Sequence, residues 1–248
     1  MTGLPALLAL LGTWPGSPGV VVPAHAGPPA RLAPIKRVET AAPAVALTFD
    51  ACATRTHTSG FDRAVYQVLK QEAVPATIFV SGRWVEVHGP EMTELAADPL
   101  IAFGDHSFDH PHMNRIPKMR MAEQIDRTEA ALARYGKKSV AFRPPFGEWN
   151  RRLVEVAKQK GLPTVTWDVV SGDPSAHTTA PRLVRNVLDR TRPGSIVIFH
   201  INGRGRKTAE ALPAILRTLR DRGLRFVFLS DLLSSQPQPA LTPSGRDR

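Results

Sequence analysis

Acidic, basic and histidine residues stand directly after the short apolar runs of this chain. They are Asp50 after 45–49, Asp105, His106 and His110 after 100–103, Arg143 after 140–142, Asp168 after 164–167, and His200 after 195–199. Imidazole and carboxylate groups bind divalent metals, and the same groups move protons during hydrolysis. If the apolar runs are parallel strands, their carboxyl ends meet at one edge of the sheet. The pattern therefore predicts one shared site at that edge.

Two histidines, His106 and His110, are four residues apart. This spacing predicts that both imidazoles lie on one face of a helical turn, where they can bind one divalent metal ion. The alternative is two unrelated surface or core histidines, because the pair alone is weak evidence. His112 follows Pro111 and is the less favoured ligand.

Two turns add further candidate groups. Arg143-Pro144-Pro145-Phe146-Gly147 is a rigid turn in which the free backbone N–H groups of Phe146 and Gly147 can point at one target. A stiff structural loop is the alternative. Asp173 lies in a Ser-Gly-Asp-Pro turn, where it either orients a neighbouring side chain or serves only the turn.

The elements that must position these groups alternate between strands and helices. Seven short apolar runs are rich in β-branched and aromatic residues and predict buried strands. They are Val45–Phe49, Ala76–Val80, Leu100–Phe103, Val140–Phe142, Thr164–Trp167, Ser195–Phe199 and Phe226–Leu229. Helical apolar stripes occur at 64–69, 121–132, 153–157, 183–188 and 212–219, with Thr178 or Thr179 as a cap of the fourth. The alternation predicts an α/β fold with a parallel sheet, either open or closed into an incomplete barrel.

The length and the ends of the chain set its organisation. The 248 residues, 42% apolar and 22% charged, suffice for one large or two small domains. Residues 1–26 carry no Asp, Glu, Lys or Arg and end in Ala-His-Ala, which predicts a signal peptide and export; an Ala/Pro-rich leader is the alternative. We expect a linker at 27–43, a domain at 44–234 and a disordered tail at 235–248. The single cysteine, Cys52, excludes an intramolecular disulfide, and no apolar stretch is long enough to predict a transmembrane segment.

The formal net charge of +10 favours anionic surroundings such as an acidic cell-wall polymer. Nucleic acid is not expected as a partner, because the basic clusters are short and lack interleaved aromatic residues. Arg204 and Arg206 follow His200 and predict a basic rim that meets an anionic substrate.

Five segments, taken together in this order, resemble the polysaccharide deacetylase family, the carbohydrate esterase family 4 with its NodB homology domain. The segments are Leu47-Thr48-Phe49-Asp50, His106-Ser107-Phe108-Asp109-His110, Arg143-Pro144-Pro145-Phe146-Gly147, Trp167-Asp168-Val169-Val170-Ser171-Gly172-Asp173 and Ile196-Val197-Ile198-Phe199-His200. The resemblance covers about residues 44–232. It implies a single domain that forms a distorted (β/α)7 barrel.

The resemblance also implies a metal-dependent hydrolase that removes acetyl groups from an N-acetylhexosamine polymer or oligomer. His106 and His110 would hold the metal, with Zn²⁺ expected and Co²⁺ or Ni²⁺ as alternatives. Asp50 would be the general base beside Arg143, and His200 the general acid oriented by Asp173. The backbone N–H of Phe146 would meet the oxyanion. Ile198 and Trp167 would line the substrate pocket. Peptidoglycan and chitin-like glycans are the expected acetylated substrates, with O-acetylated xylan as an alternative.

Two positions depart from the family pattern. The first motif usually reads Thr-Phe-Asp-Asp, and Ala51 stands where the second Asp would bind the metal. Three replacements are open: Asp50 itself, a side chain from the following loop (Cys52 or His57), or two histidines completed by water. The Trp of the fourth motif is also absent, and Phe146, Trp149 and Trp167 are the candidate substitutes. Phe-Asp-Ala-Cys is similar to a variant subgroup of the family; the competing hypothesis is a weak or inactive glycan-binding protein.

Overall fold

The computed structural model describes residues 32–57 and 59–235. The expected signal peptide and all but the first residue of the expected tail lie outside this range. The strands are β1 (Ala44–Ala51), β2 (Ala76–Val80), β3 (Ile101–Asp105), β4 (Ser139–Phe142), β5 (Val169–Val170), β6 (Ile196–His200) and β7 (Arg225–Phe226). The helices are α1 (Arg63–Gln71), α2 (Gly82–Val87), α3 (Gly89–Ala97), α4 (Lys118–Ala133), α5 (Arg151–Gln159), α6 (Ala180–Leu188), α7 (Thr208–Asp221) and α8 (Leu229–Ser234), with short 3₁₀ turns at Met113–Arg115 and Pro145–Gly147.

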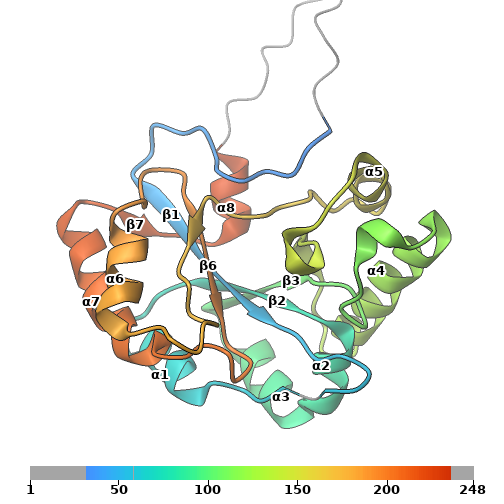
Figure 1. Ribbon diagram of the computed structural model, residues 1–248, viewed down its shortest axis with the longest axis horizontal. Helices are drawn as coiled ribbons and strands as arrows, with labels where there is room; N and C mark the ends of the chain where they lie inside the picture. Colours follow the sequence, from blue (N-terminus) through green and yellow to red (C-terminus); the bar gives the residue numbers. More distant parts are fainter. Residues whose placement is uncertain (1–31, 58, 236–248) are drawn as a thin grey trace, which may run out of the picture. The chain divides into compact units, whose positions relative to one another are not determined.

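The sheet is parallel and has β1 near its centre, in the order β4-β3-β2-β1-β6-β5, while β7 pairs with the start of β1 (Figure 1). The pairing register places Asp50 beside Phe79 on one neighbour and beside His200 on the other. One strand further on, Val80 pairs with Asp105, the residue before His106. The register therefore brings three candidate segments to one edge. The predicted α/β fold with a parallel sheet is confirmed.

The β1 strand is buried along its whole length, and its two faces carry different kinds of side chain. Val45, Leu47, Phe49 and Ala51 belong to the main apolar cluster, which also contains the buried residues of α1, α6 and α7. Because side chains alternate along a strand, Thr48 and Asp50 lie on the other face. The apolar packing that holds β1 therefore leaves its two polar residues for the site.

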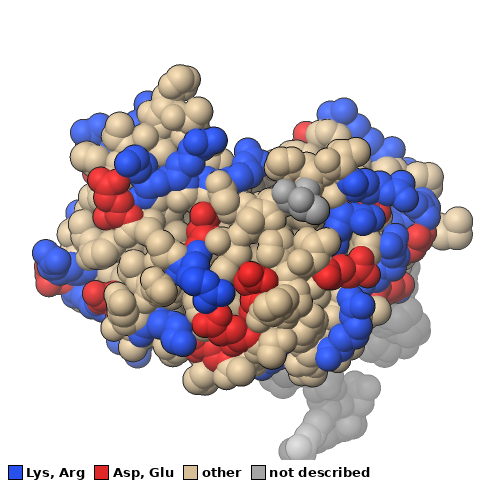
Figure 2. All heavy atoms as spheres, turned by 90° about the horizontal axis from the view of Figure 1, so that it is seen from below, with Lys and Arg blue, Asp and Glu red and all other residues tan. Residues whose placement is uncertain are grey.

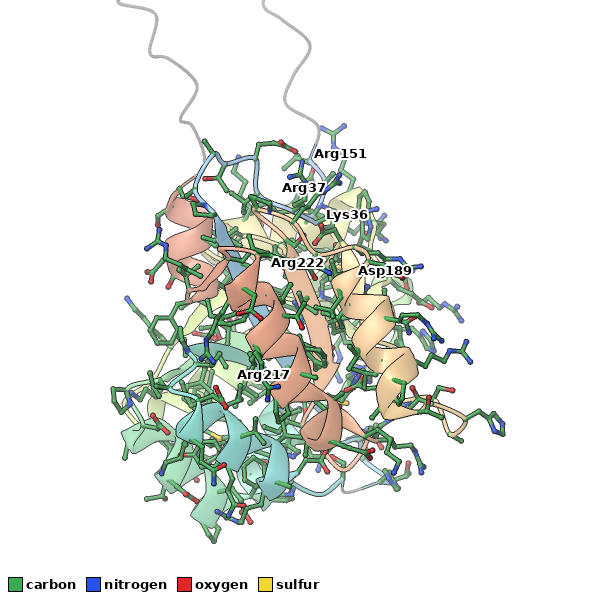
Figure 3. All side chains as sticks on the ribbon, turned by 90° about the vertical axis from the view of Figure 1, so that its left-hand side faces the viewer. Lys36, Arg37, Arg151, Asp189, Arg217 and Arg222 are labelled. Carbon is green, nitrogen blue, oxygen red and sulfur yellow. The ribbon has the colours of Figure 1, made fainter. Side chains whose placement is uncertain are left out.

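Helices α6 and α7 pack side by side and cover the sheet near β5 and β6 (Figure 3). Thr179 caps α6 by accepting a hydrogen bond from the N–H of Arg182 (3.3 Å), as one of the two predicted caps. Beyond the last turn of α7, Arg222 donates to the carbonyl of Leu188 (2.5 Å). This contact joins the C-terminal ends of the two helices, while Thr208, at the N-terminal end of α7, donates its hydroxyl to Asp173 in the site (3.0 Å).

Three parts of the chain differ from the expected elements. Residues 164–167 form only isolated bridges, to Phe142 and Ile35, and the fifth strand lies at Val169–Val170 instead. The run 226–229 is divided between β7 and the start of α8. Periodicity in such short apolar runs does not separate a strand from neighbouring irregular backbone. Helices α2 and α3 were not predicted from the sequence.

The segment 32–43, expected as part of a linker, packs on the domain. The N–H of Ile35 donates to the carbonyl of Thr164 (2.9 Å), and Val38 is fully buried. The packed part of the chain therefore begins before residue 44. None of the helices within the described residues has the length and apolar character needed to cross a membrane.

Candidate active site

A cavity of about 470 Å³ lies at the carboxyl ends of β1 and β6. Eight of the predicted site residues line it: Asp50, His106, His110, Phe146, Trp167, Asp173, Ile198 and His200. Cys52 and Arg204 line it as well. Arg143 lies behind the cavity wall, and His57 is exposed outside the lining. The structure therefore brings these eight side chains together at one edge of the sheet.

Asp50 is paired with a fully buried arginine that reaches it from the end of β4. Arg143 donates from Nη1 to Asp50 Oδ1 (2.7 Å) and from Nη2 to Thr48 Oγ1 (2.8 Å) and the Thr166 carbonyl (3.2 Å). Its guanidinium also lies 3.9 Å from the centre of the Phe79 ring. Burial works to raise the pKa of Asp50, but the charge of Arg143 leads the effects that hold this pKa below its usual value. Asp50 is therefore ionised at neutral pH.

His106 and His110 lie together, but not on a helix. Residues 106–110 are irregular, with positive φ at Ser107 (63°) and His110 (57°), so the helical turn expected from their spacing is wrong. Asp105 stabilises the turn by accepting the N–H of Ser107 on Oδ1 (2.7 Å). The two imidazole rings nevertheless contact each other, with centres 4.9 Å apart. Left-handed backbone gives the proximity that the sequence spacing suggested.

Both imidazoles are neutral at neutral pH. Burial lowers the pKa of His106, and burial together with the neighbouring His106 lowers the pKa of His110 to about 3. His106 Nδ1 lies 2.8 Å from the carbonyl oxygen of Arg143, so Nδ1 carries the proton and Nε2 keeps its lone pair. That Nε2 faces Asp50 Oδ2 at 3.5 Å. Two acceptors facing each other in a buried site are satisfied by a cation or a water molecule between them.

These donors fit a divalent metal in kind, because neutral imidazole and carboxylate are common ligands of Zn²⁺ and Co²⁺. A hydrogen bond from the far imidazole nitrogen to a backbone carbonyl is typical of metal-binding histidines. Across residues 32–57 and 59–235, however, no three His, Cys, Asp or Glu side chains are arranged to hold a metal ion. Ala51 lies in the apolar cluster and offers no donor. A ligand set of two histidines flanked by Asp50 is what the chain supplies.

Neither of the two loop residues considered as the missing metal ligand, His57 and Cys52, has the properties of a metal ligand in this structure. His57 is exposed and does not line the cavity, so the structure gives no support to it as a ligand. Cys52 lines the cavity, but its Sγ accepts a hydrogen bond from Asn202 Nδ2 (3.3 Å). Burial raises the pKa of the Cys52 thiol to about 12. The thiol is protonated at neutral pH, consistent with a small buried side chain.

His200 and Asp173 form a hydrogen-bonded pair on the other side of Asp50. His200 donates from Nδ1 to Asp173 Oδ1 (2.9 Å) and from its backbone N–H to Oδ2 (2.7 Å). Ser171 and Thr208 donate their hydroxyls to the same carboxylate, at 3.0 Å each. Burial works to lower the pKa of His200, but the hydrogen bond and charge of Asp173 raise it overall. The ring is thereby oriented and favoured as a proton donor.

The turn after β4 presents one backbone N–H rather than two. The N–H of Gly147 donates to the carbonyl of Pro144 (3.1 Å), so the prediction for Gly147 is wrong. The N–H of Phe146 has no hydrogen-bond acceptor among the described residues. Phe146 has a positive φ (61°) and is 53% exposed, and its ring makes a T-shaped contact with His110 and stacks on His112. This leaves one N–H available to a ligand.

Two of the acidic residues expected at the site have structural roles. Asp168 precedes β5 and binds the Ser195 hydroxyl (2.9 Å) and the Ile196 N–H (2.8 Å), so it supports the start of β6 rather than its end. Asp105 is fully buried and does not line the cavity, and burial raises its pKa well above the usual value. Position relative to an apolar run does not reveal the side of the strand to which a carboxylate points.

Sequence reasoning missed the groups that hold the catalytic candidates in place. Thr48 anchors Arg143, and Thr208 and Ser171 anchor Asp173. Thr48 and Ser171 lie inside the motif segments, so their proximity to charged residues was a usable signal. Thr208 carried none, because it starts a helix distant from Asp173 in the sequence.

Comparison with known proteins places these motifs in a family context. The sequence model of the polysaccharide deacetylase family matches residues 37–165. A peptidoglycan-N-acetylglucosamine deacetylase from Listeria monocytogenes is 30% identical over 195 residues, which make up 78% of this chain and 40% of that protein. The chain spans about half the length, or less, of the first curated relatives it matches.

Two solved structures show the range of proteins with this fold. A CE4 family pseudoenzyme from Bacillus anthracis has a TM-score of 0.73 and 25% identity, covering 84% of this chain and 71% of that one. A mutant of it is described as having restored enzymatic activity. A family 4 acetyl xylan esterase from Clostridium thermocellum, in complex with a cobalt ion, has a TM-score of 0.69 and 27% identity, covering 78% and 93%. Similarity alone therefore does not separate an enzyme from a pseudoenzyme.

Proposed function

Because this chain belongs to the polysaccharide deacetylase family, we propose that it is a hydrolase that removes acetyl groups from an N-acetylhexosamine polymer or oligomer. One observation carries the proposal: a single cavity brings together an arginine-held carboxylate (Asp50), two neutral imidazoles (His106 and His110) and a His200–Asp173 pair. These groups supply a base, a site for a cation and an acid. Peptidoglycan and chitin-like glycans are the proposed substrates.

Asp50 takes the proton of the attacking water. A general base must be ionised, and the guanidinium of Arg143 keeps the Asp50 carboxylate ionised although it is buried. Arg143 binds only Oδ1 of Asp50, which leaves Oδ2 facing the cavity side and His106. The hydrogen bonds of Arg143 to Thr48 and Thr166 fix the direction of that oxygen.

His106 and His110 would hold the divalent metal, with Asp50 beside them. The expected ion is Zn²⁺, with Co²⁺ or Ni²⁺ as alternatives. When bound, such an ion polarises the acetyl carbonyl and makes the attacking water more acidic. Catalytic zinc sites commonly have three protein ligands, so two imidazoles without a second aspartate predict a weakly held, exchangeable ion.

His200 donates the proton to the departing amine. Its Nδ1 is committed to Asp173, which leaves Nε2 as the donor toward the cavity. The backbone N–H of Phe146 meets the negative oxygen that develops as water adds to the acetyl carbon. Ile198 and Trp167 line the apolar part of the pocket that receives the acetyl methyl group.

The chain acts outside the cytoplasm, on or near an anionic cell-wall polymer. The net charge of +10 and the uncharged, apolar N-terminal residues support this proposal. Figure 2 views the side toward which β1 and β6 run, and Lys and Arg residues lie at many points of this face with Asp and Glu among them. Such mixed charge does not resemble the continuous basic stripe of a nucleic-acid interface.

The second candidate is a catalytically weak or inactive glycan-binding protein. It is favoured by Ala51 and by the absence, within the described residues, of a three-ligand metal group. A CE4 family pseudoenzyme from Bacillus anthracis is among the solved structures similar to this chain, which supports an inactive protein with this fold as the alternative.

Acetate release from peptidoglycan and chitooligosaccharides, measured with the full chain, separates the two. The deacetylase predicts release that EDTA abolishes, that Zn²⁺ or Co²⁺ restores, and that His106→Ala lacks. No release from any substrate, with no metal found by elemental analysis, would instead support the binding protein.

A further inference from the structure

Arg204 is a cation at the cavity that the reaction described above does not use. It lies in the loop between β6 and α7, is exposed, and lines the cavity with Asp50 and His200. Among the residues with described positions, no carboxylate forms an ion pair or hydrogen bond with Arg204.

The loop that carries Arg204 has a fixed backbone. Asp62 Oδ2 accepts the N–H groups of both flanking glycines, Gly203 (2.9 Å) and Gly205 (3.1 Å). Gly203 has a φ of 81°, which favours glycine, and a Cβ on Gly205 would lie 2.3 Å from the carbonyl oxygen of His200. The backbone of Arg204 is therefore held beside the strand end that carries His200.

This arrangement is suited to a singly charged anion. Phosphate sites usually combine several cations or free backbone N–H groups. Here the N–H groups on both sides of Arg204 already bind Asp62, and Lys207 pairs with Glu210 (3.1 Å). One planar guanidinium remains, and it matches the two oxygens of a carboxylate.

Building on the proposed function, we infer that Arg204 is a specificity-determining residue that binds a carboxylate of the glycan near the acetylated sugar. The substrate class is then an acidic glycan whose sugars carry carboxylates, rather than a neutral polymer of the chitin type.

The test uses a peptidoglycan glycan from which the stem peptides have been removed, so that its sugar carboxylates are free. It compares kcat/KM for acetate release from this native form and from the same glycan with those carboxylates reduced to alcohols. We expect the wild type to prefer the native form, and Arg204→Gln to lower this preference about tenfold or more. The structure places only Arg204 of the expected basic rim at the cavity, because Arg206 is exposed on the same loop but does not line it, and Arg206→Gln is therefore the matched control. It should keep the preference within about twofold.

An equal preference in the wild type and Arg204→Gln would overturn the inference, and so would a wild type that treats both forms alike. If neither form releases acetate, the proposed function fails. The inference is then decided by binding: the dissociation constants of the native and the reduced glycan are compared for the wild type and for Arg204→Gln. Equal preference in the two proteins overturns the inference. A phosphorylated glycan bound more tightly through Arg204 than the carboxylated one would also overturn the carboxylate assignment.

Discussion

Replacing Arg143 should lower the free energy of unfolding, because the buried Asp50 carboxylate then loses its partner. The guanidinium is fully buried and donates to Asp50, Thr48 and the Thr166 carbonyl. Arg143→Met leaves the Asp50 carboxylate buried without its partner, which costs about 3–5 kcal/mol in comparable pairs. For a domain of this size, that loss lowers Tm by about 6–20 °C.

The pH dependence gives the sign of the effect. In the wild type, Arg143 lowers the folded-state pKa of Asp50, so the pair stabilises the fold above the unfolded-state pKa and is lost as pH falls through the folded one. In Arg143→Met the guanidinium no longer offsets burial, which is the largest effect and works to raise the pKa of Asp50, so the penalty grows as pH rises above the unfolded value. The difference in stability between the two proteins should therefore shrink from pH 7 toward pH 4.

The assay is urea denaturation of the metal-free full chain for Arg143→Met, Asp50→Asn and the double variant. We expect the double variant to be more stable than the sum of the single effects predicts, by about 1–3 kcal/mol. Arg63→Met is the control, because its ion pair with Glu94 (2.7 Å) is exposed to solvent and its loss should change the free energy of unfolding little. Additive single effects, or a loss that does not change with pH, would refute the reasoning.

Four further outcomes follow from the geometry. Asp173→Asn removes the charge that raises the pKa of His200, so the alkaline limb of the kcat–pH profile should move to lower pH; an unmoved limb would exclude His200 as the acid. His110→Asn should weaken Zn²⁺ binding about tenfold or more in calorimetry, whereas an unchanged affinity would place the metal elsewhere. His57→Gln should leave Zn²⁺ affinity within about twofold, and a large loss would make this exposed loop a ligand. Gly205→Ala should cost about 1–3 kcal/mol in denaturation because its Cβ meets the His200 carbonyl; full stability would mean that the loop is not held there.

The strand ends were the most predictable part of the molecule. The run Ala76–Val80 is a strand with the expected bounds, and Asp50 and His200 meet because each directly follows its predicted apolar run, and the two runs pair in parallel. Along β1 the structure places Phe49 in the apolar cluster and Asp50 at the cavity. Local pattern was enough here because strand geometry is regular.

The contacts across long sequence separations were not predictable. Nothing local to Arg143 shows that its guanidinium crosses behind the site to Thr48, which is 95 residues away. The histidine pair was predicted for the wrong reason, because positive φ angles at Ser107 and His110 replace the helical turn. Asp168 was misplaced, since a carboxylate that follows an apolar run can also serve the backbone of a neighbouring strand.

The most direct test of the central claim compares acetate release by the wild type and Asp50→Asn on the same acetylated glycan, with Zn²⁺ or Co²⁺ present. If Asp50 is the base of a hydrolytic site, the variant should unfold cooperatively as the wild type does and lose about 10²-fold or more in rate. A folded variant that releases acetate as fast as the wild type would contradict the account.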